Sequence, residues 1–262
     1  EGAMHKAMHE AQSYVSFILL LASLFTISGG IFLRGSLVGK PVTNAAIIAI
    51  GTVLASFMAT TGASMLLIRP LLRAIKNRQH KVHIVVFFIF TVSNIGGLLT
   101  PLGDPPLFLG YLKGVPFEWT LFNLIPEWVL VNGILIALFF AIDTIIYKRE
   151  VKKGNTALEE DTGPKEKLRI EGGVQFILLA GVVLSIYFQG FFQTKYDWWP
   201  TFGIQEAAMA LMMMLSLVVA KPKSQVRQNN EFTWSPIKEV AVLFAGIFAC
   251  MIPALMYLEI HG

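Results

Sequence analysis

The chain has 262 residues, of which 55% are hydrophobic and only 15% are charged, and its formal net charge at pH 7 is +4. This composition lies outside the range of soluble globular domains and predicts a membrane protein that crosses the bilayer several times. The basic residues are gathered in a few loops, so the positive charge marks membrane topology and is not a sign of nucleic-acid binding. The single cysteine, Cys250, lies in an apolar segment, which excludes a disulfide framework.

Seven apolar blocks follow one another along the chain, at residues 14–33, 42–72, 84–112, 121–147, 174–192, 204–220 and 236–258. A helix needs roughly 20 residues to cross a bilayer, so most of these blocks are long enough. If all seven crossed, the basic clusters would lie on both sides of the membrane. If residues 42–72 instead enter and leave on one side, all of the 21 Lys and Arg residues except Lys6, Lys113 and Lys195 lie on one side. Basic residues accumulate in cytoplasmic loops, which favours the second arrangement.

We therefore predict an all-α polytopic membrane protein with about six transmembrane helices, one re-entrant hairpin over residues 42–72 and one discontinuous helix over residues 84–112. In this arrangement the N-terminus lies outside, and the loops 73–83, 148–172 and 221–235 are cytoplasmic. The expected location is the inner cell membrane of a bacterial-type cell, with the lipid bilayer as the surrounding partner.

The predicted hairpin turns at a small and polar sequence, Ala59-Thr60-Thr61-Gly62-Ala63-Ser64. Hydroxyl groups and freed carbonyls at such a tip can bind a small ion, and the N-terminus of the returning arm adds a partial positive charge. A packing seam of small residues between helices is the alternative.

The third apolar block is interrupted by the sequence SNIGGLLTPLGDPP, from Ser93 to Pro106. A broken helix survives in a membrane only if it is buried in protein or lines a cavity, so this segment predicts a transport site. Asp104 is its only acid and is predicted to carry a proton or sodium, or alternatively to cap the second half-helix. The candidate binding residues are Thr60, Thr61, Gly62, Ser64, Ser93, Asn94, Gly96, Gly97, Thr100, Pro101, Gly103, Asp104 and Pro105. Asp104, Asn94 and Thr61 are the candidate sodium ligands.

The remaining acids and histidines give no sign of an enzyme. Asp143 and Glu206 lie near the ends of apolar blocks, where we expect them at the membrane interface. No pair of histidines has metal-ligand spacing, and no nucleophile–base arrangement stands out. We expect no cofactor other than sodium or a proton as the coupling ion.

Two similar segments, LFTISGGIF at residues 24–32 and LFAGIF at residues 243–248, run in opposite directions in this topology and favour an inverted repeat. We expect a first repeat over residues 1–147, a cytoplasmic linker over residues 148–172, and the start of a second repeat over residues 173–262. The chain lacks an initiator methionine and a second hairpin, so we expect it to be a fragment.

The hairpin, the basic loop and the sequence SNIGGLLTPLGDPPLFLGYL resemble the ion transporter superfamily. The likeness is strongest to its bacterial branch of NhaD-type sodium/proton antiporters and citrate-transporter-like proteins, and it covers residues 14–112 strongly and 234–258 weakly. It implies that the hairpin tip and the unwound helix form the ion and substrate site, in a homodimer with an elevator-like motion.

Within this superfamily, carboxylate carriers have Ser-Asn-Thr at the tip, where this chain has Ala59-Thr60-Thr61, and antiporters often carry Gly-Asp, as at Gly103-Asp104. The resemblance therefore implies a secondary active transporter, with sodium/proton antiport as the first expectation. A cation-coupled carrier of citrate or another di- or tricarboxylate is the alternative. A channel or a membrane scaffold without transport activity is a third possibility of a different class.

Overall fold

The computed structural model describes residues 2–35, 37–153, 168–196, 198–222 and 224–261. Its elements, in chain order, are α1 (Gly2–Ser28), β1 (Phe32–Arg34), α2 (Pro41–Met58), α3 (Thr60–Ala74), α4 (Val82–Thr91), the 3-10 helix η1 (Ile95–Leu99), α5 (Pro105–Leu112), α6 (Phe117–Lys152), β2 (Arg169–Glu171), α7 (Val174–Lys195), α8 (Ile204–Val219), α9 (Gln225–Asn229) and α10 (Ser235–His261). The predicted all-α class is confirmed, with one small addition. Strands β1 and β2 pair antiparallel, with Phe32 opposite Glu171.

Six helices in the described part of the chain are long and apolar enough to cross a membrane, which agrees with the predicted number. They are Lys6–Ser28, Pro41–Met58, Val82–Leu99, Phe117–Lys152, Val174–Lys195 and Ser235–Ala254. The set nevertheless differs from the predicted one, because it includes α2 and omits α8, an apolar helix of only 16 residues. Length decides this difference, since a span needs about 17–25 residues and α2 has 18 whereas α8 has 16.

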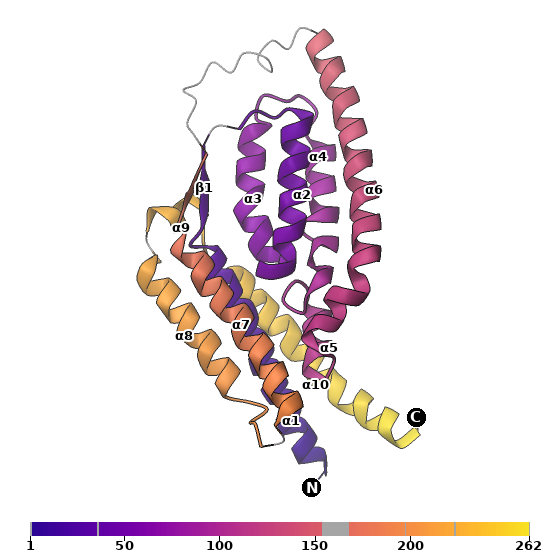
Figure 1. Ribbon diagram of the computed structural model, residues 1–262, viewed down its shortest axis with the longest axis vertical. Coiled ribbons are helices and arrows are strands. Elements are labelled where there is room, and N and C mark those ends of the chain that lie inside the picture. The colour runs from indigo at the N-terminus through magenta and orange to yellow at the C-terminus, as the bar shows by residue number, and fades with distance from the viewer. Residues whose placement is uncertain (1, 36, 154–167, 197, 223, 262) are drawn as a thin grey trace.

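The helices form two groups, with α2, α3, α4 and α6 in the upper part of Figure 1 and α1, α7, α8 and α10 in the lower part. In one group α1 packs against α7, α8 and α10, and α7 packs against α8. In the other group α2 packs against α3, η1 and α6, and α4 packs against α6. Helix α1 joins the groups through contacts with α3 and α5. Its apolar residues share one continuous core with those of the second group, which includes Phe17, Leu24, Met58 and Phe108.

Helices α2 and α3 form an antiparallel hairpin whose two open ends point towards the same end of the molecule (Figure 1). The hairpin turns at Ala59, whose φ of 61° and ψ of 153° place a non-glycine residue in a region that is almost restricted to glycine. Such a conformation costs about 1–3 kcal/mol and persists only when the surroundings fix it. Ala59 is buried, with 4% of its surface exposed.

The third apolar block is broken between α4 and α5, as the sequence predicts. We call residues 92–104 the interruption; they contain the short helix η1 and irregular backbone on both sides of it. Pro101 and Pro105 lack an N–H group and therefore cannot donate the hydrogen bonds of a continuous helix. Glycines at 96, 97 and 103 allow the chain to fold back closely on itself.

Helix α6 continues to Lys152, through the first residues of the segment that we expected to be a linker. The strand β2 occupies residues near the other end of that segment. Residues 154–167, including the acidic run Glu159-Glu160-Asp161, lie outside the described residues.

Asp143 is completely buried, so the prediction that it lies at the interface was wrong. Its carboxylate accepts hydrogen bonds from Arg78 (2.6 Å) and Asn44 (3.0 Å), and contacts His83 Nε2 at 2.9 Å. The Arg78 guanidinium also donates to Glu150 at 2.9 Å, and Glu150 accepts from the backbone N–H of His80. We call these six residues the Arg78 network. The cause of the error is distance along the chain, because the partners of Asp143 lie 60 to 99 residues before it.

Glu206 is also buried rather than interfacial, with 7% of its surface exposed. One carboxylate oxygen accepts from the Ser16 hydroxyl at 2.5 Å, and the other accepts from the Gly203 N–H at 2.7 Å. The second bond caps the N-terminus of α8, because it gives the backbone N–H of the N-cap residue Gly203 an acceptor.

The C-terminal end of α1 is fixed by Arg227 of α9, which is fully buried. Its guanidinium donates to the carbonyls of Ala220 (2.6 Å) and Thr26 (2.8 Å), and lies 4.6 Å from the centre of the Phe232 ring. Burial lowers the pKa of Arg227 to about 10, so this side chain stays charged at neutral pH. The ends of α1 and α8 are therefore held together by one cation.

Candidate functional site

The hairpin tip and the interruption meet in the structure. The Thr60 N–H, at the start of α3, donates to the Gly103 carbonyl at 3.2 Å. A Cβ atom on Gly103 would lie only 2.0 Å from the Gly97 oxygen, and one on Gly97 would lie 2.8 Å from Thr60 Cγ2. The two predicted halves of the site are thus brought into contact by backbone atoms that leave no room for side chains at these glycines.

Hydroxyl groups link the interruption to the end of α2. Ser56 Oγ donates to the Gly96 carbonyl at 2.5 Å, and Thr100 Oγ1 donates to the Ser56 carbonyl. The Leu102 N–H donates to Thr100 Oγ1 at 3.2 Å, and the Trp128 indole donates to Gly96 at 3.3 Å. Thr100 and the Gly96 carbonyl therefore stabilise the broken backbone. Ser56 was not among the candidates, because its position inside an apolar helix gave no signal.

Ser64 and Ser93 also come together, with their hydroxyl oxygens 2.8 Å apart. They connect the first turns of α3 to the end of α4. Asn94 is exposed, and its carbonyl accepts from the Gly97 N–H at 3.2 Å. Thr61 is exposed at the tip, while Gly62 and Pro101 are buried.

Asp104 is the N-cap residue of α5, and its main-chain carbonyl accepts from Leu107 (3.1 Å) and Phe108 (3.3 Å). Its side chain is partly buried and makes no capping hydrogen bond. The carboxylate is therefore available for another role. Pro105 and Pro106 have no N–H, so the first turn of α5 offers an anion little. Among the described residues no group of three or more His, Cys, Asp or Glu side chains could hold a metal ion.

Unlike the N-terminus of α5, the N-terminus of α3 has N–H groups that can bind an anion. The N–H groups of its first turn have no acceptor inside the helix, and only that of Thr60 is used by Gly103. The amides of Thr61 and Gly62 remain at the positive end of a 15-residue helix. This end can bind an anionic group such as a carboxylate.

Ser28 lies against the same turn and was missed by the sequence analysis. It is completely buried, and its hydroxyl oxygen has no hydrogen-bond partner among the described residues. A Cβ atom on Gly62 would lie 2.5 Å from Ser28 Oγ, so the hydroxyl faces the first turn of α3 directly. The Ser-Gly-Gly sequence that ends the first apolar block is the only signal that could have drawn attention to it.

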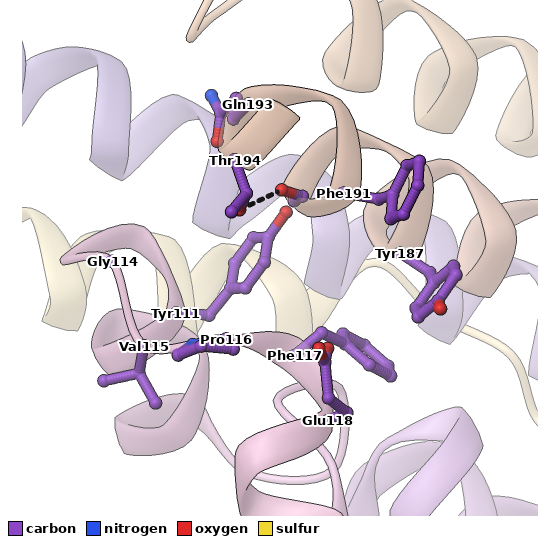
Figure 2. A pocket seen from close by; sticks show the side chains of 11 residues that line it. Tyr111, Gly114, Val115, Pro116, Phe117, Glu118, Tyr187, Phe191, Gln193 and Thr194 are labelled. Atoms are coloured by element: carbon purple, nitrogen blue, oxygen red, sulfur yellow. Dashed lines mark hydrogen bonds between the residues drawn. The ribbon is translucent and has the colours of Figure 1, made fainter. Parts of the chain in front are cut away.

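A separate cavity of about 280 Å³ lies beyond the other end of α5. Figure 2 shows Tyr111 at its centre, Phe117 and Glu118 from the start of α6, and Tyr187 and Thr194 from α7. The Tyr111 hydroxyl donates to the Ile186 carbonyl at 2.9 Å. Because α5 has eight residues, this cavity lies about 12 Å from Asp104 along the helix axis.

The comparisons with known proteins agree with a transport role. The family described as "Putative citrate transport" matches residues 1–262. Two proteins, each named "Uncharacterized transporter", are 26% identical over 213 residues, one from Mycobacterium bovis and one from Mycobacterium tuberculosis. The alignment covers 80% of this chain and 46% of each relative, so the chain spans about half the length of the curated relatives it matches. No solved structure matches it. Because the family match extends over every residue, the chain belongs to the "Putative citrate transport" family, which is a family of transporters and not of enzymes.

Proposed function

We propose that the protein that carries this chain is a secondary transporter of citrate or a related di- or tricarboxylate, coupled to a cation. Family membership supports the substrate class. The observation that carries the proposal is the first turn of α3, where the amides of Thr61 and Gly62 have no acceptor inside the helix and the unpaired Ser28 hydroxyl lies beside Gly62. Backbone N–H groups at a helix N-terminus and a neutral hydroxyl are suitable donors for a carboxylate.

Asp104 supplies the coupling in this proposal. A carboxylate near a bound tricarboxylate repels it, and the repulsion is strong where water is scarce. A sodium ion or a proton on Asp104 removes this repulsion, so that substrate and cation bind together. The absence of a capping bond to the Asp104 side chain supports this role.

Sodium/proton exchange without an organic substrate is the second candidate. The state of Asp104 favours this candidate too, since a partly buried carboxylate without a capping bond can alternate between a proton and sodium. The two candidates differ in the need for the α3 amides and Ser28, which exchange alone does not require.

Uptake of labelled citrate into proteoliposomes, with and without a sodium or pH gradient, distinguishes the candidates. Carboxylate transport predicts uptake that rises with the cation gradient. In Asp104→Asn, we expect citrate binding to persist but to lose its dependence on cation concentration. Sodium-driven pH change with no citrate binding would overturn the proposal in favour of exchange.

Ser28→Ala tests the anion site directly. A hydrogen bond to a charged group contributes about 1.5 kcal/mol, so citrate should bind roughly tenfold more weakly. The melting temperature should not fall, because the removed hydroxyl is buried without a partner. Ser23→Ala is the matched control: Ser23 lies in the same helix, and its hydroxyl donates to the Leu20 carbonyl at 2.8 Å. Equal citrate affinity in both variants would exclude Ser28 from the site.

A further inference from the structure

A buried carboxylate that the proposed transport site does not use lines a polar cavity near the start of α8. The carboxylate belongs to Glu206, and the cavity has a volume of about 150 Å³. Residues of α1, α5, α7 and α8 and of the loops beside α5 and α8 form the lining, and most of them have polar side chains. No Lys or Arg is among the described residues that line it. Glu206 is the only acid in that lining, so the cavity has a negative charge on its wall.

The printed partners of Glu206 hold its carboxylate in place but bring no positive charge. They are the Ser16 hydroxyl at 2.5 Å and the Gly203 N–H at 2.7 Å, both neutral groups. Lys113, the basic residue that follows the lining of α5 in the chain, forms an ion pair with Glu10. Burial of a charge without a counter-charge is costly. A bound cation in the cavity would remove this cost.

The cavity also offers oxygen atoms that can accept further contacts. An ionised carboxylate has about four lone-pair positions, of which Glu206 uses two for its hydrogen bonds. Gln205 Oε1 lies 3.2 Å from the Tyr111 hydroxyl, and Gln189 Oε1 accepts from the Trp199 indole at 3.0 Å. Each amide oxygen has two lone pairs and therefore retains one. Hard cations take oxygen ligands, and one carboxylate balances the charge of one monovalent ion.

We propose that this cavity is a sodium site, in which Glu206 is the anionic ligand and Gln189 and Gln205 supply neutral oxygens. A water molecule takes up about 30 Å³ in the liquid, so the cavity has room for the ion and several waters that complete its coordination. The site is separate from Asp104, which lies about 10 Å from Tyr111 along the axis of α5. It does not depend on the identity of the transported substrate.

Binding of labelled sodium to the protein that carries this chain, purified in detergent without citrate, tests the site. The measurement is made in the Asp104→Asn variant, so that a cation on Asp104 makes no contribution. We expect saturable binding that unlabelled sodium displaces and choline does not. Adding Glu206→Gln should abolish it, and the fold should persist because glutamine also serves at this position of a capping box. Glu118→Gln, at an exposed glutamate of α6, is the matched control and should retain the ion.

Two further measurements do not depend on removing the charge. Gln205→Leu takes away one neutral oxygen and should weaken sodium binding, while the Tyr111 hydroxyl keeps the Ile186 carbonyl as its acceptor. Sodium chloride should raise the melting temperature of Asp104→Asn above that in choline chloride at equal ionic strength, since a ligand of the folded state stabilises it.

The outcomes separate this inference from the transport proposal. Equal sodium binding with Glu206→Gln and with Glu118→Gln would overturn the site. So would the absence of sodium binding in Asp104→Asn, even where the native protein transports citrate. Sodium binding that only Glu206→Gln removes, in a protein that does not transport citrate, would support the site and contradict the transport proposal alone.

Discussion

Gly97 and Gly103 approach each other so closely that neither has room for a side chain. In Gly103→Ala the new Cβ would lie 2.0 Å from a main-chain oxygen, which cannot move away as a flexible side chain can. We expect the stability to fall by about 1–3 kcal/mol, because the interruption must separate from the hairpin tip. Citrate binding should be lost for the same reason. Gly133→Ala in α6 is the control, since no atom lies within 4 Å of its Cβ position. Thermal unfolding in detergent measures both, and equal melting temperatures would contradict the close approach.

At Ala59 we expect replacement by glycine to change the stability in the opposite direction to the usual one. Replacing alanine by glycine inside a helix destabilises a protein by roughly 0.5–1 kcal/mol. At Ala59, where φ is 61°, the same change should remove backbone strain and leave the melting temperature equal or higher. Ala55→Gly, four residues earlier in α2 and also buried, should lower it. A fall of similar size in both variants would show that the tip is not strained.

The Arg78 network connects the open end of the hairpin to α6. Arg78 is almost completely buried, and both of its carboxylate partners are buried as well. Arg78→Leu should cost about 3–5 kcal/mol, because it leaves Asp143 and Glu150 without their cation. Arg149→Leu, on the exposed side of the same helix end, should change the stability little.

A double variant separates charge from packing in this network. Arg78→Leu combined with Asp143→Leu removes one of the two stranded charges together with the arginine. It should be more stable than Arg78→Leu alone, since buried ion pairs can often be replaced by apolar residues. Thermal unfolding of the three proteins gives the comparison, and a double variant that is the least stable would contradict this account.

The elements that sequence could predict are those that depend on neighbouring residues. Apolar runs located the long helices, and glycine and proline located the break before Asp104, because both signals are local. The structure also brings Thr60 and Gly103 together, as expected for one site formed by the tip and the interruption. Ser28 and Asp143 could not be placed in this way. Both residues contact side chains or backbone far away in the sequence, and no local sequence pattern predicts such contacts.

At the scale of the whole molecule, helix α1 is the element that unites the two helix groups. It packs against the hairpin arm α3 and α5 on one side and against α7, α8 and α10 on the other. Ser28, at its C-terminal end, faces the hairpin tip, while Arg227 and Asn230 hold that end through the carbonyls of Thr26 and Gly29. The proposed substrate site is therefore formed between the groups, so any relative movement of the groups would alter it.

The arrangement of the helix ends predicts the topology. Figure 1 shows the open ends of the hairpin and the C-terminal end of α6 towards one end of the molecule, and both chain termini towards the other. The basic residues of the loop after α3 belong to the first end, which we propose to be cytoplasmic. Lys40 and Gln79, on either side of the hairpin, should then lie on the same side of the membrane.

Cysteine labelling checks this prediction in a Cys250→Ser background, which removes the native thiol. An impermeant maleimide added to intact cells should label Val115→Cys, in the turn between α5 and α6. It should label Lys40→Cys and Gln79→Cys only after the membrane is opened. Labelling of Lys40→Cys and Gln79→Cys from opposite sides would mean that residues 42–72 cross the bilayer once. The substrate-site proposal would then fail with the topology, because a single crossing would carry the first turn of α3 away from the interruption.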